Sequence, residues 1–263
     1  MSSLTITLIQ TNLFWEDKKA NLQMFQQKIE SVKEKTEIVI LPEMFNTGFS
    51  MKPELFAEKM DGTTVEWMKR ISAEKKIILT GSLMIKEEGR YYNRLLWILP
   101  NGEYGVYDKR HLFAYADEHT HYSAGNKKLI ASVKGWKINL QVCYDLRFPV
   151  WARQAPGELE NKYDLLINVA NWPEKRSLAW QTLLRARAIE NQCFVAGVNR
   201  VGVDGNNISY NGASTIIDPL GEIIYQKDKE EDIFTYTLEK EIVTETRNHF
   251  PFWKDADDFI ITD

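Results

Sequence analysis

Apolar and polar positions follow two different periods along the chain, and these periods predict strands and helices in alternation. Short runs rich in Ile, Val and Leu are typical of buried strands, whereas apolar side chains that recur every three or four residues are typical of amphipathic helices. We therefore predict strands over Thr5–Gln10, Glu37–Leu41, Lys76–Ile85, Tyr92–Leu99, Tyr104–Lys109, Lys137–Cys143, Asp164–Ala170, Cys193–Asn199 and Ser214–Gln226. We predict helices over Asp17–Lys35, Val65–Lys75 and Ser177–Asn191. The alternation favours an α/β fold with buried strands.

Local signals add two turns and one helix start to this picture. Asn101-Gly102 lies between two predicted strands and is a strong hairpin signal, because both residue types tolerate positive φ. The segment Ser214–Gln226 is expected to turn at Asp218-Pro-Leu-Gly221. Ser177 is expected to cap the helix that follows it. The tail after Glu239 is aromatic and mixed, and it has no clear period.

The chain is expected to form one domain over residues 1–263, because it has no low-complexity segment, no linker rich in Gly, Ser or Pro, and no internal repeat. The tail at about 240–263 is expected to pack on this domain or to contact a second copy. Hydrophobic residues make up 44% and charged residues 27%, which is ordinary for a soluble globular protein. The net charge of -4, without a run of Lys or Arg, argues against a nucleic-acid partner.

The N-terminal segment and the cysteine content favour a cytoplasmic protein. The first residues lack the basic end and apolar stretch of a signal peptide, and no apolar stretch approaches the ~20 residues that span a bilayer. The two cysteines, Cys143 and Cys193, do not form a disulfide framework and lack the CxxC spacing of a zinc site. Each is therefore either a small buried residue or a nucleophile.

Three reactive side chains follow predicted strands at the point where each strand ends: Glu43, Lys109 and Cys143. The carboxyl ends of strands in open α/β sheets face the binding crevice. A nucleophile, a base and a cation could therefore converge there while the strands hold them rigidly. The sequence becomes abruptly polar directly after Cys143, which favours a reactive thiol over an inert one.

Each of these side chains also has a commoner explanation, namely an inert buried thiol, a solvated loop carboxylate and a surface amine. In the functional interpretation, Cys143 attacks as a thiolate, Glu43 accepts and later returns a proton, and Lys109 stabilises a developing oxyanion. Glu118 is a candidate second carboxylate that could orient Lys109 or a substrate amide. Its alternative is again a solvated loop residue.

Three other interpretations remain open at this point. A Cys–His hydrolase would use His111, His119 or His121, although none of them follows a buried strand. A metal site could form from Asp117, His119 and His121, but two histidines at i and i+2 in a polar loop are a weak signal. A dimeric scaffold or ligand-sensing domain has no need to retain a cysteine, a lysine and a glutamate together.

Five motifs carry a resemblance to a known family. They are LPEMFNTGF, YDKRHLF followed by Glu118 and Gly125, QVCYDLRFP, NVANWP and LLRARAIENQCFVAGVNRVG. In order and spacing they resemble the nitrilase, or carbon–nitrogen hydrolase, superfamily, from the first strand to about Gln226. The resemblance implies an αββα sandwich that pairs into an αββα–αββα dimer, and it implies no metal and no organic cofactor. It also implies that Glu43, Lys109 and Cys143 are the catalytic triad, assisted by Glu118.

Within the superfamily, three longer segments resemble the omega-amidase branch. They are CYDLRFPVWAR, NVANWPEKRSLAWQTLLRARAIENQ and GNNISYNGASTIIDPLGEI. The branch hydrolyses the terminal amide of 2-oxoglutaramate or 2-oxosuccinamate and releases ammonia. A nitrilase or an N-carbamoyl amide hydrolase would share the same triad and stays an alternative.

This resemblance leads to expectations about the substrate pocket. The backbone N–H of Tyr144 is expected to be a second oxyanion donor. The distant carboxylate of such a substrate should meet a cation, preferably an Arg fork, and Arg176 is our candidate. Arg147 lies closer to the nucleophile, but there a structural ion pair is expected. Trp172 and Phe45 are candidate pocket walls, and core packing would explain either of them equally well.

Overall fold

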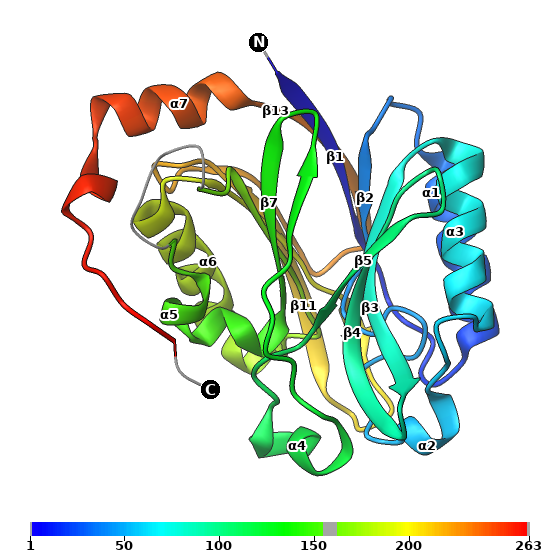
Figure 1. The fold of residues 1–263 in the computed structure, drawn as a ribbon. Helices are drawn as coiled ribbons and strands as arrows, with labels where there is room; N and C mark the ends of the chain where they lie inside the picture. The colour runs from blue at the N-terminus through cyan, green and yellow to red at the C-terminus, as the bar shows by residue number, and fades with distance from the viewer. Residues whose placement is uncertain (1, 155–161, 262–263) are drawn as a thin grey trace.

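Two β-sheets pack face to face, and helices cover the outer face of each sheet (Figure 1). The structure is a computed structural model that describes residues 2–154 and 162–261. The layers are those of an αββα sandwich, which confirms the predicted fold class. Both sheets mix parallel and antiparallel strands.

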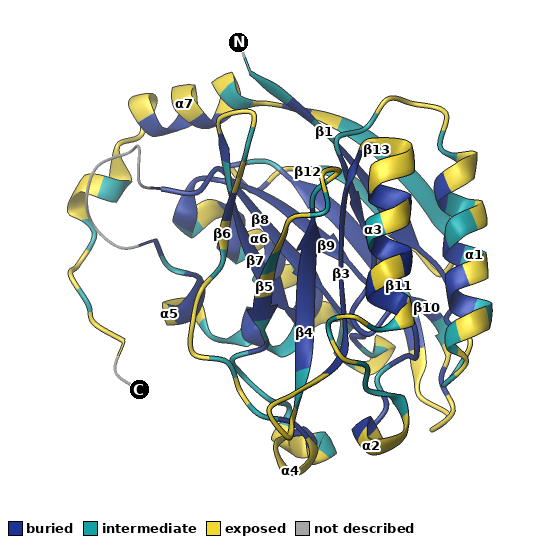
Figure 2. Cartoon of the chain, turned by 45° about the vertical axis from the view of Figure 1, so that its right-hand side comes forward, coloured by how far each residue is buried: buried dark blue, intermediate teal, exposed yellow. Residues whose placement is uncertain are grey.

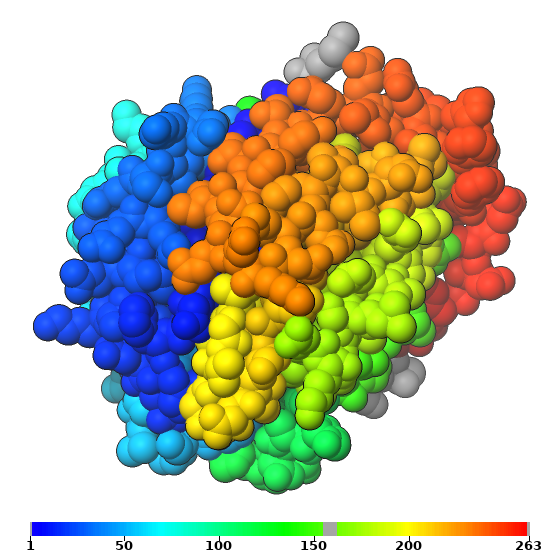
Figure 3. Space-filling view, turned by 180° about the vertical axis from the view of Figure 1, so that it is seen from behind, coloured from blue at the N-terminus to red at the C-terminus, as the bar shows by residue number. Residues whose placement is uncertain are grey.

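The first sheet has six strands, and its centre is parallel. In spatial order they are β13 (Asp232–Glu239), β1 (Ser3–Gln10), β2 (Ile38–Ile40), β3 (Ile78–Glu87), β4 (Arg90–Ile98) and β5 (Tyr104–Asp108). β1, β2 and β3 are parallel to one another, whereas β13, β4 and β5 pair antiparallel with their neighbours. Figure 3 shows the C-terminal strands, in orange, beside the blue N-terminal segment, in agreement with the pairing of β13 with β1.

The second sheet has seven strands and a parallel centre of its own. In spatial order they are β10 (Val201–Val203), β11 (Ser209–Ile217), β9 (Phe194–Val198), β8 (Leu165–Val169), β7 (Trp136–Val142) and β6 (Ile130–Val133), with β12 (Ile223–Asp228) also paired to β11. β7, β8 and β9 run parallel.

Helices pack on the two outer faces of the sandwich. α1 (Lys18–Ser31) and α3 (Thr63–Lys75) share one hydrophobic core with the outer face of the first sheet. α5 (Pro149–Ala152) and α6 (Ser177–Asn191) share another with the second sheet. The described residues also form the helices α2 (Pro53–Phe56), α4 (Glu118–His121) and α7 (Lys240–His249), and the 3-10 turns η1 (Ala114–Ala116), η2 (Cys143–Arg147), η4 (Glu174–Arg176) and η5 (Phe252–Asp255).

Burial on both faces explains why the central strands read as continuous apolar runs. In β8, Leu165 and Ile167 contribute to the core between the sheets, whereas Leu166 between them packs under α6. Figure 2 shows these strands as the buried interior of the molecule. The rigid central strands therefore end inside a closed sandwich, and their carboxyl ends can hold reactive groups in fixed positions.

Most predicted elements are present, and the differences include the start of α6 and a helix in the tail. Ser177 is the first residue of α6 and does not cap it, because Arg176 occupies the cap position after η4, and the Ser177 hydroxyl instead accepts from Gln181 and Asn211. The sequence analysis missed α7. This helix packs on the domain through Val243 and Arg247.

Both predicted turns are present. The chain reverses between β4 and β5, where Gly102 takes a φ of 86°, and again at Gly221 with a φ of 92°. In the second turn, the Asp218 side chain accepts from the backbone N–H of Leu220 and Glu222. Within the described ranges, no helix combines the length and the apolar character that crossing a membrane requires.

Candidate active site

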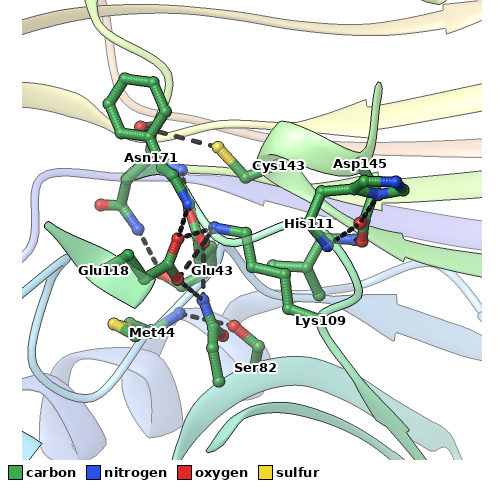
Figure 4. Close-up of polar contacts among 12 residues, drawn as sticks. Glu43, Met44, Ser82, Lys109, His111, Glu118, Cys143, Asp145 and Asn171 are labelled. Carbon is green, nitrogen blue, oxygen red and sulfur yellow. Dashed lines mark hydrogen bonds and ion pairs between the residues drawn. The ribbon is translucent and has the colours of Figure 1, made fainter. Parts of the chain in front are cut away.

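The side chains of Glu43, Lys109 and Glu118 meet at the same end of the sandwich, next to Cys143 (Figure 4). Glu43 follows β2, Lys109 follows β5 and Cys143 follows β7, as the positions in the sequence predicted. Glu118 begins α4. The two carboxylates and the amine are fully buried, whereas Cys143 is partly exposed.

Lys109 is the centre of this cluster. Its Nζ donates to Glu43 Oε1 at 2.9 Å and to both carboxylate oxygens of Glu118 at 3.0 and 2.9 Å. Burial by itself lowers the pKa of Lys109, but the negative charges of Glu118 and Glu43 outweigh it, and its pKa lies above the ordinary value. Lys109 therefore carries a positive charge at neutral pH and can act as a fixed electrostatic donor.

Glu118 is fixed from two sides. Besides Lys109, the backbone N–H of Phe113 donates to its Oε2 at 2.5 Å. Burial raises the pKa of Glu118 above its ordinary value, although the charge of Lys109 and the bond from Phe113 act against this. Glu118 thus ties the segment before α4 to the amine of Lys109.

Two further donors, from Asn93 and Asn171, hold the Glu43 carboxylate, and neither residue was predicted from the sequence to belong to the site. Asn93 Nδ2 donates to Glu43 Oε1 at 2.8 Å and to Glu118 Oε1 at 3.2 Å, so one amide spans both carboxylates. The backbone N–H of Asn171 donates to Glu43 Oε2 at 2.8 Å. Asn171 closely follows the apolar strand β8, a pattern that could have revealed it, because a buried amide requires partners. Asn93 lies within β4 between Tyr92 and Arg94 and shows no such pattern.

Cys143 is the first residue of η2 and has a φ of 45°. A positive φ is strained for a residue with a Cβ, and it lifts the side chain out of the strand direction. Its Sγ lies 3.9 Å from the carbonyl oxygen of Asn171. Burial is the largest cause that raises the pKa of the Cys143 thiol well above its ordinary value, and the negative charge of Glu43 is the next. The positive charge of Lys109 lowers this pKa but does not outweigh the other two. The resting thiol is therefore protonated and needs a base.

Tyr144 follows in the first turn of η2, where a backbone N–H has no acceptor within the helix. Tyr144 and Cys143 both line a cavity of about 170 Å³. Typical sites for drug-sized ligands occupy roughly 300–1,000 Å³, so this cavity favours a small substrate. Lys109, Asn171 and Trp172 also line it.

Of the two residues predicted to form pocket walls, one lines the cavity and the other does not. Trp172 lines it and also packs against Trp180 in the core below α6. Phe45 does not line it, because its ring packs between Phe25 and Trp67 under the helices of the first sheet. The prediction that Phe45 forms a pocket wall is therefore wrong.

Two arginines line the cavity without a carboxylate partner among the described residues. The guanidinium of Arg147 lies 4.9 Å from the centre of the Trp172 ring, and that of Arg176 lies 5.1 Å from the centre of the Phe113 ring. The indole N–H of Trp172 also donates to the carbonyl oxygen of Arg176 at 2.8 Å. Within residues 2–154 and 162–261, Arg147 thus lacks the structural ion pair that was expected for it, and both cations face the cavity, where an anionic ligand could bind.

The histidines do not support the Cys–His or the metal interpretation. His111 contacts Asp145 with its Nδ1 at 2.8 Å, and His119 and His121 are exposed on α4. In residues 2–154 and 162–261, no group of three or more His, Cys, Asp or Glu side chains is arranged to hold a metal ion.

Comparison with known proteins agrees with this geometry. The family model described as carbon–nitrogen hydrolase matches residues 5–248. The chain belongs to the carbon–nitrogen hydrolase family. It is 45% identical to omega-amidase YafV of Escherichia coli K12, over 98% of this chain and 99% of that protein. It is 32% identical to a 2-oxoglutaramate amidase of Bacillus subtilis, over 95% and 96% of the two chains.

A solved structure matches this carbon–nitrogen hydrolase over 100% of both chains. It is XC1258 from Xanthomonas campestris, a CN-hydrolase superfamily protein with an arsenic adduct in its active site. The sequences are 45% identical, and the folds superpose with a TM-score of 0.96. The enzyme is thus a hydrolase of carbon–nitrogen bonds other than peptide bonds, as the sequence predicted.

Proposed function

We propose that this enzyme hydrolyses the terminal amide of a small omega-amido 2-oxo acid, such as 2-oxoglutaramate or 2-oxosuccinamate, to the dicarboxylate and ammonia. The observation that carries the proposal is one small cavity lined by Cys143 and Lys109 together with two arginines that have no carboxylate partner in the part of the chain that the structure describes. The similarity to proteins named omega-amidase and 2-oxoglutaramate amidase supports this substrate class.

In the proposed mechanism, Glu43 takes the proton from the Cys143 thiol, and the thiolate attacks the amide carbon. The raised pKa of the thiol supports a base-assisted attack, because little thiolate exists beforehand. Protonated Glu43 gives the proton to the departing nitrogen, so that the carbon–nitrogen bond breaks and ammonia leaves. The acyl group remains on Cys143 as a thioester. Glu43 then activates a water molecule, which releases the carboxylate and restores the thiol.

The oxyanion formed in each step is assigned to Lys109 and the backbone N–H of Tyr144. Lys109 stays charged, and its contacts with both glutamates fix its position before the substrate binds. One preorganised donor of this kind contributes roughly 3–4 kcal/mol in the transition state. Glu118 assists by holding Lys109.

Arg176 and Arg147 are assigned to the carboxylate at the far end of the substrate. Both guanidinium groups are planar forks that suit a carboxylate. Cation–π contacts with Trp172 and Phe113 hold the two guanidinium groups beside the cavity. These contacts leave the positive charges free to pair with a carboxylate. A substrate that spans the cavity would then present its amide to Cys143.

We expect Arg176→Ala and Arg147→Ala each to raise KM for an omega-amido 2-oxo acid by about tenfold or more, because a hydrogen bond to a charged group contributes roughly 1.5–3 kcal/mol. Steady-state kinetics would measure this. Lys175→Ala is the matched control, since Lys175 is an exposed cation next to Arg176 that does not line the cavity. An unchanged KM in both arginine variants would contradict the assignment.

The substrate itself is tested by ammonia release from 2-oxoglutaramate, 2-oxosuccinamate, glutamine, a nitrile and a carbamoyl compound at equal concentrations. We expect the two oxo-acid amides to react at least about tenfold faster than glutamine. Glutamine carries an α-ammonium group, which the two arginines would repel. Preferred turnover of the nitrile or of the carbamoyl compound would instead assign the enzyme to another branch of the family.

A further inference from the structure

Lys109 and Cys143 are placed by different sheets, so their relative position needs a connection other than strand pairing. β5 carries Lys109 at the edge of the first sheet, and β7 carries Cys143 within the second. No ladder of backbone hydrogen bonds joins these two strands. Catalysis by an amine and a thiol acting on the same carbonyl nevertheless requires a fixed distance between them.

One buried carboxylate provides such a connection. Asp145 Oδ1 accepts from the backbone N–H of His111 at 2.9 Å and contacts His111 Nδ1 at 2.8 Å. Its Oδ2 accepts from the Tyr107 hydroxyl at 2.7 Å and from the backbone N–H of Val142 at 3.0 Å. Tyr107 and His111 flank Lys109 at two residues on either side, and Val142 directly precedes the nucleophile.

We propose that Asp145, Tyr107 and His111 are positioning residues that hold the end of β5 in register with the turn that carries Cys143. Figure 4 shows Asp145 and His111 on the opposite side of Lys109 from the two glutamates. The glutamates fix the Lys109 ammonium group, and Asp145 fixes the backbone from which that side chain and the thiol extend. The proposal goes beyond the proposed substrate, because it concerns the distance between the two reactive groups.

The contacts around Asp145 favour this role over simple filling of the core. Asp145 is fully buried, and four hydrogen bonds use its available acceptor positions. Two further contacts hold Tyr107 and His111 in place. The indole N–H of Trp151 donates to the Tyr107 hydroxyl at 2.8 Å, and the His111 ring stacks on Phe148 with the ring centres 3.8 Å apart. The four hydrogen bonds to the Asp145 carboxylate come from residues within two positions of Lys109 or Cys143.

Substitutions at His111 separate the hydrogen bond from the stacking contact. His111→Phe keeps a ring against Phe148 but removes the Nδ1 donor, whereas His111→Asn loses the ring but places an amide N–H near the position of Nδ1. We expect His111→Phe to lower kcat by about tenfold to a hundredfold with a KM change below about threefold, because a misplacement of ~1 Å can cost ~10²-fold in rate. His111→Asn should retain most of the activity.

Tyrosine variants supply a second comparison. Tyr107→Phe removes a phenol–carboxylate bond next to Lys109, and Tyr225→Phe removes the equivalent bond to Asp232, which lies outside the cavity. We expect a loss of kcat for Tyr107→Phe similar to that for His111→Phe, and a change below about twofold for Tyr225→Phe. Thermal melting of all four variants would report any loss of stability separately.

The rate at which iodoacetamide alkylates Cys143 needs no amide substrate, so it tests the positioning even if the proposed function fails. Displacement of Lys109 removes a charge that favours the thiolate, so alkylation at neutral pH should slow in His111→Phe and Tyr107→Phe but not in His111→Asn. Alkylation and kcat within about twofold of the unmodified protein in both Phe variants would overturn the proposal. The same holds if His111→Asn is as impaired as His111→Phe.

Discussion

Cys143→Ala should abolish amide hydrolysis, by about four orders of magnitude or more, while the fold stays intact. The reason is that, among the described residues that line the cavity, Cys143 is the only thiol, and no serine or threonine hydroxyl lies there to replace it. Cys143→Ser should be nearly as inactive, because a hydroxyl is far harder for Glu43 to deprotonate than a thiol. Ammonia release measures turnover, and circular dichroism checks the fold.

Cys193→Ala is the matched control for the nucleophile. Cys193 is also a free thiol, but it is fully buried in the core below α6 and does not line the cavity. We expect this variant to lose about 1 kcal/mol of stability, as for a similar loss of buried volume, and to keep its turnover. Full turnover by well-folded Cys143→Ala would refute the nucleophile assignment.

Glu43→Gln should have opposite effects on turnover and on the reactivity of the thiol. Turnover should fall by about 10³-fold or more, because the variant loses the group that moves the proton in each step. Yet Glu43 is also one of the causes that raise the pKa of Cys143, and a neutral amide removes that cause while Lys109 remains. The pKa of Cys143 should therefore decrease. The pH midpoint of alkylation by iodoacetamide should move to lower pH.

Glu58→Gln is the corresponding control for the carboxylate. Glu58 pairs with Lys18 at 2.9 Å and with Thr64, away from the cavity, and its side chain is largely buried. Turnover and the alkylation midpoint should both stay unchanged in this variant. If Glu43→Gln kept its turnover, or moved the midpoint to higher pH, Glu43 would not be the base that faces the thiol.

The local order of elements could largely be predicted from the sequence, whereas short and polar elements could not. The central strands show long apolar runs because both of their faces are buried. The sequence of α7 shows no clear apolar pattern, because Val243 is the only apolar residue that this helix buries. The start of α6 was also misjudged, because a 3-10 turn places Arg176 rather than Ser177 at the cap.

In the candidate site, too, some residues could be predicted from the sequence and others could not. Glu43, Lys109 and Cys143 were predictable because each lies at the exit of a strand within a recognisable motif. Asn93 was not, since its importance depends on two carboxylates from distant parts of the chain. Phe45 and Trp172 looked alike in the sequence, yet the turn at Met44, with a φ of 43°, precedes a ring that enters the helix-side core.

The sequence by itself determined the alternating elements, the family and the three central candidate residues, because strand periodicity and short motifs are local properties. Only the tertiary structure decided which side chains face one another. Lys109 and Glu43 are 66 residues apart, and the bonds of Asp145 join segments from two different sheets. Contacts of this kind depend on how the sheets stack, and therefore on the packing of the whole chain rather than on any single segment.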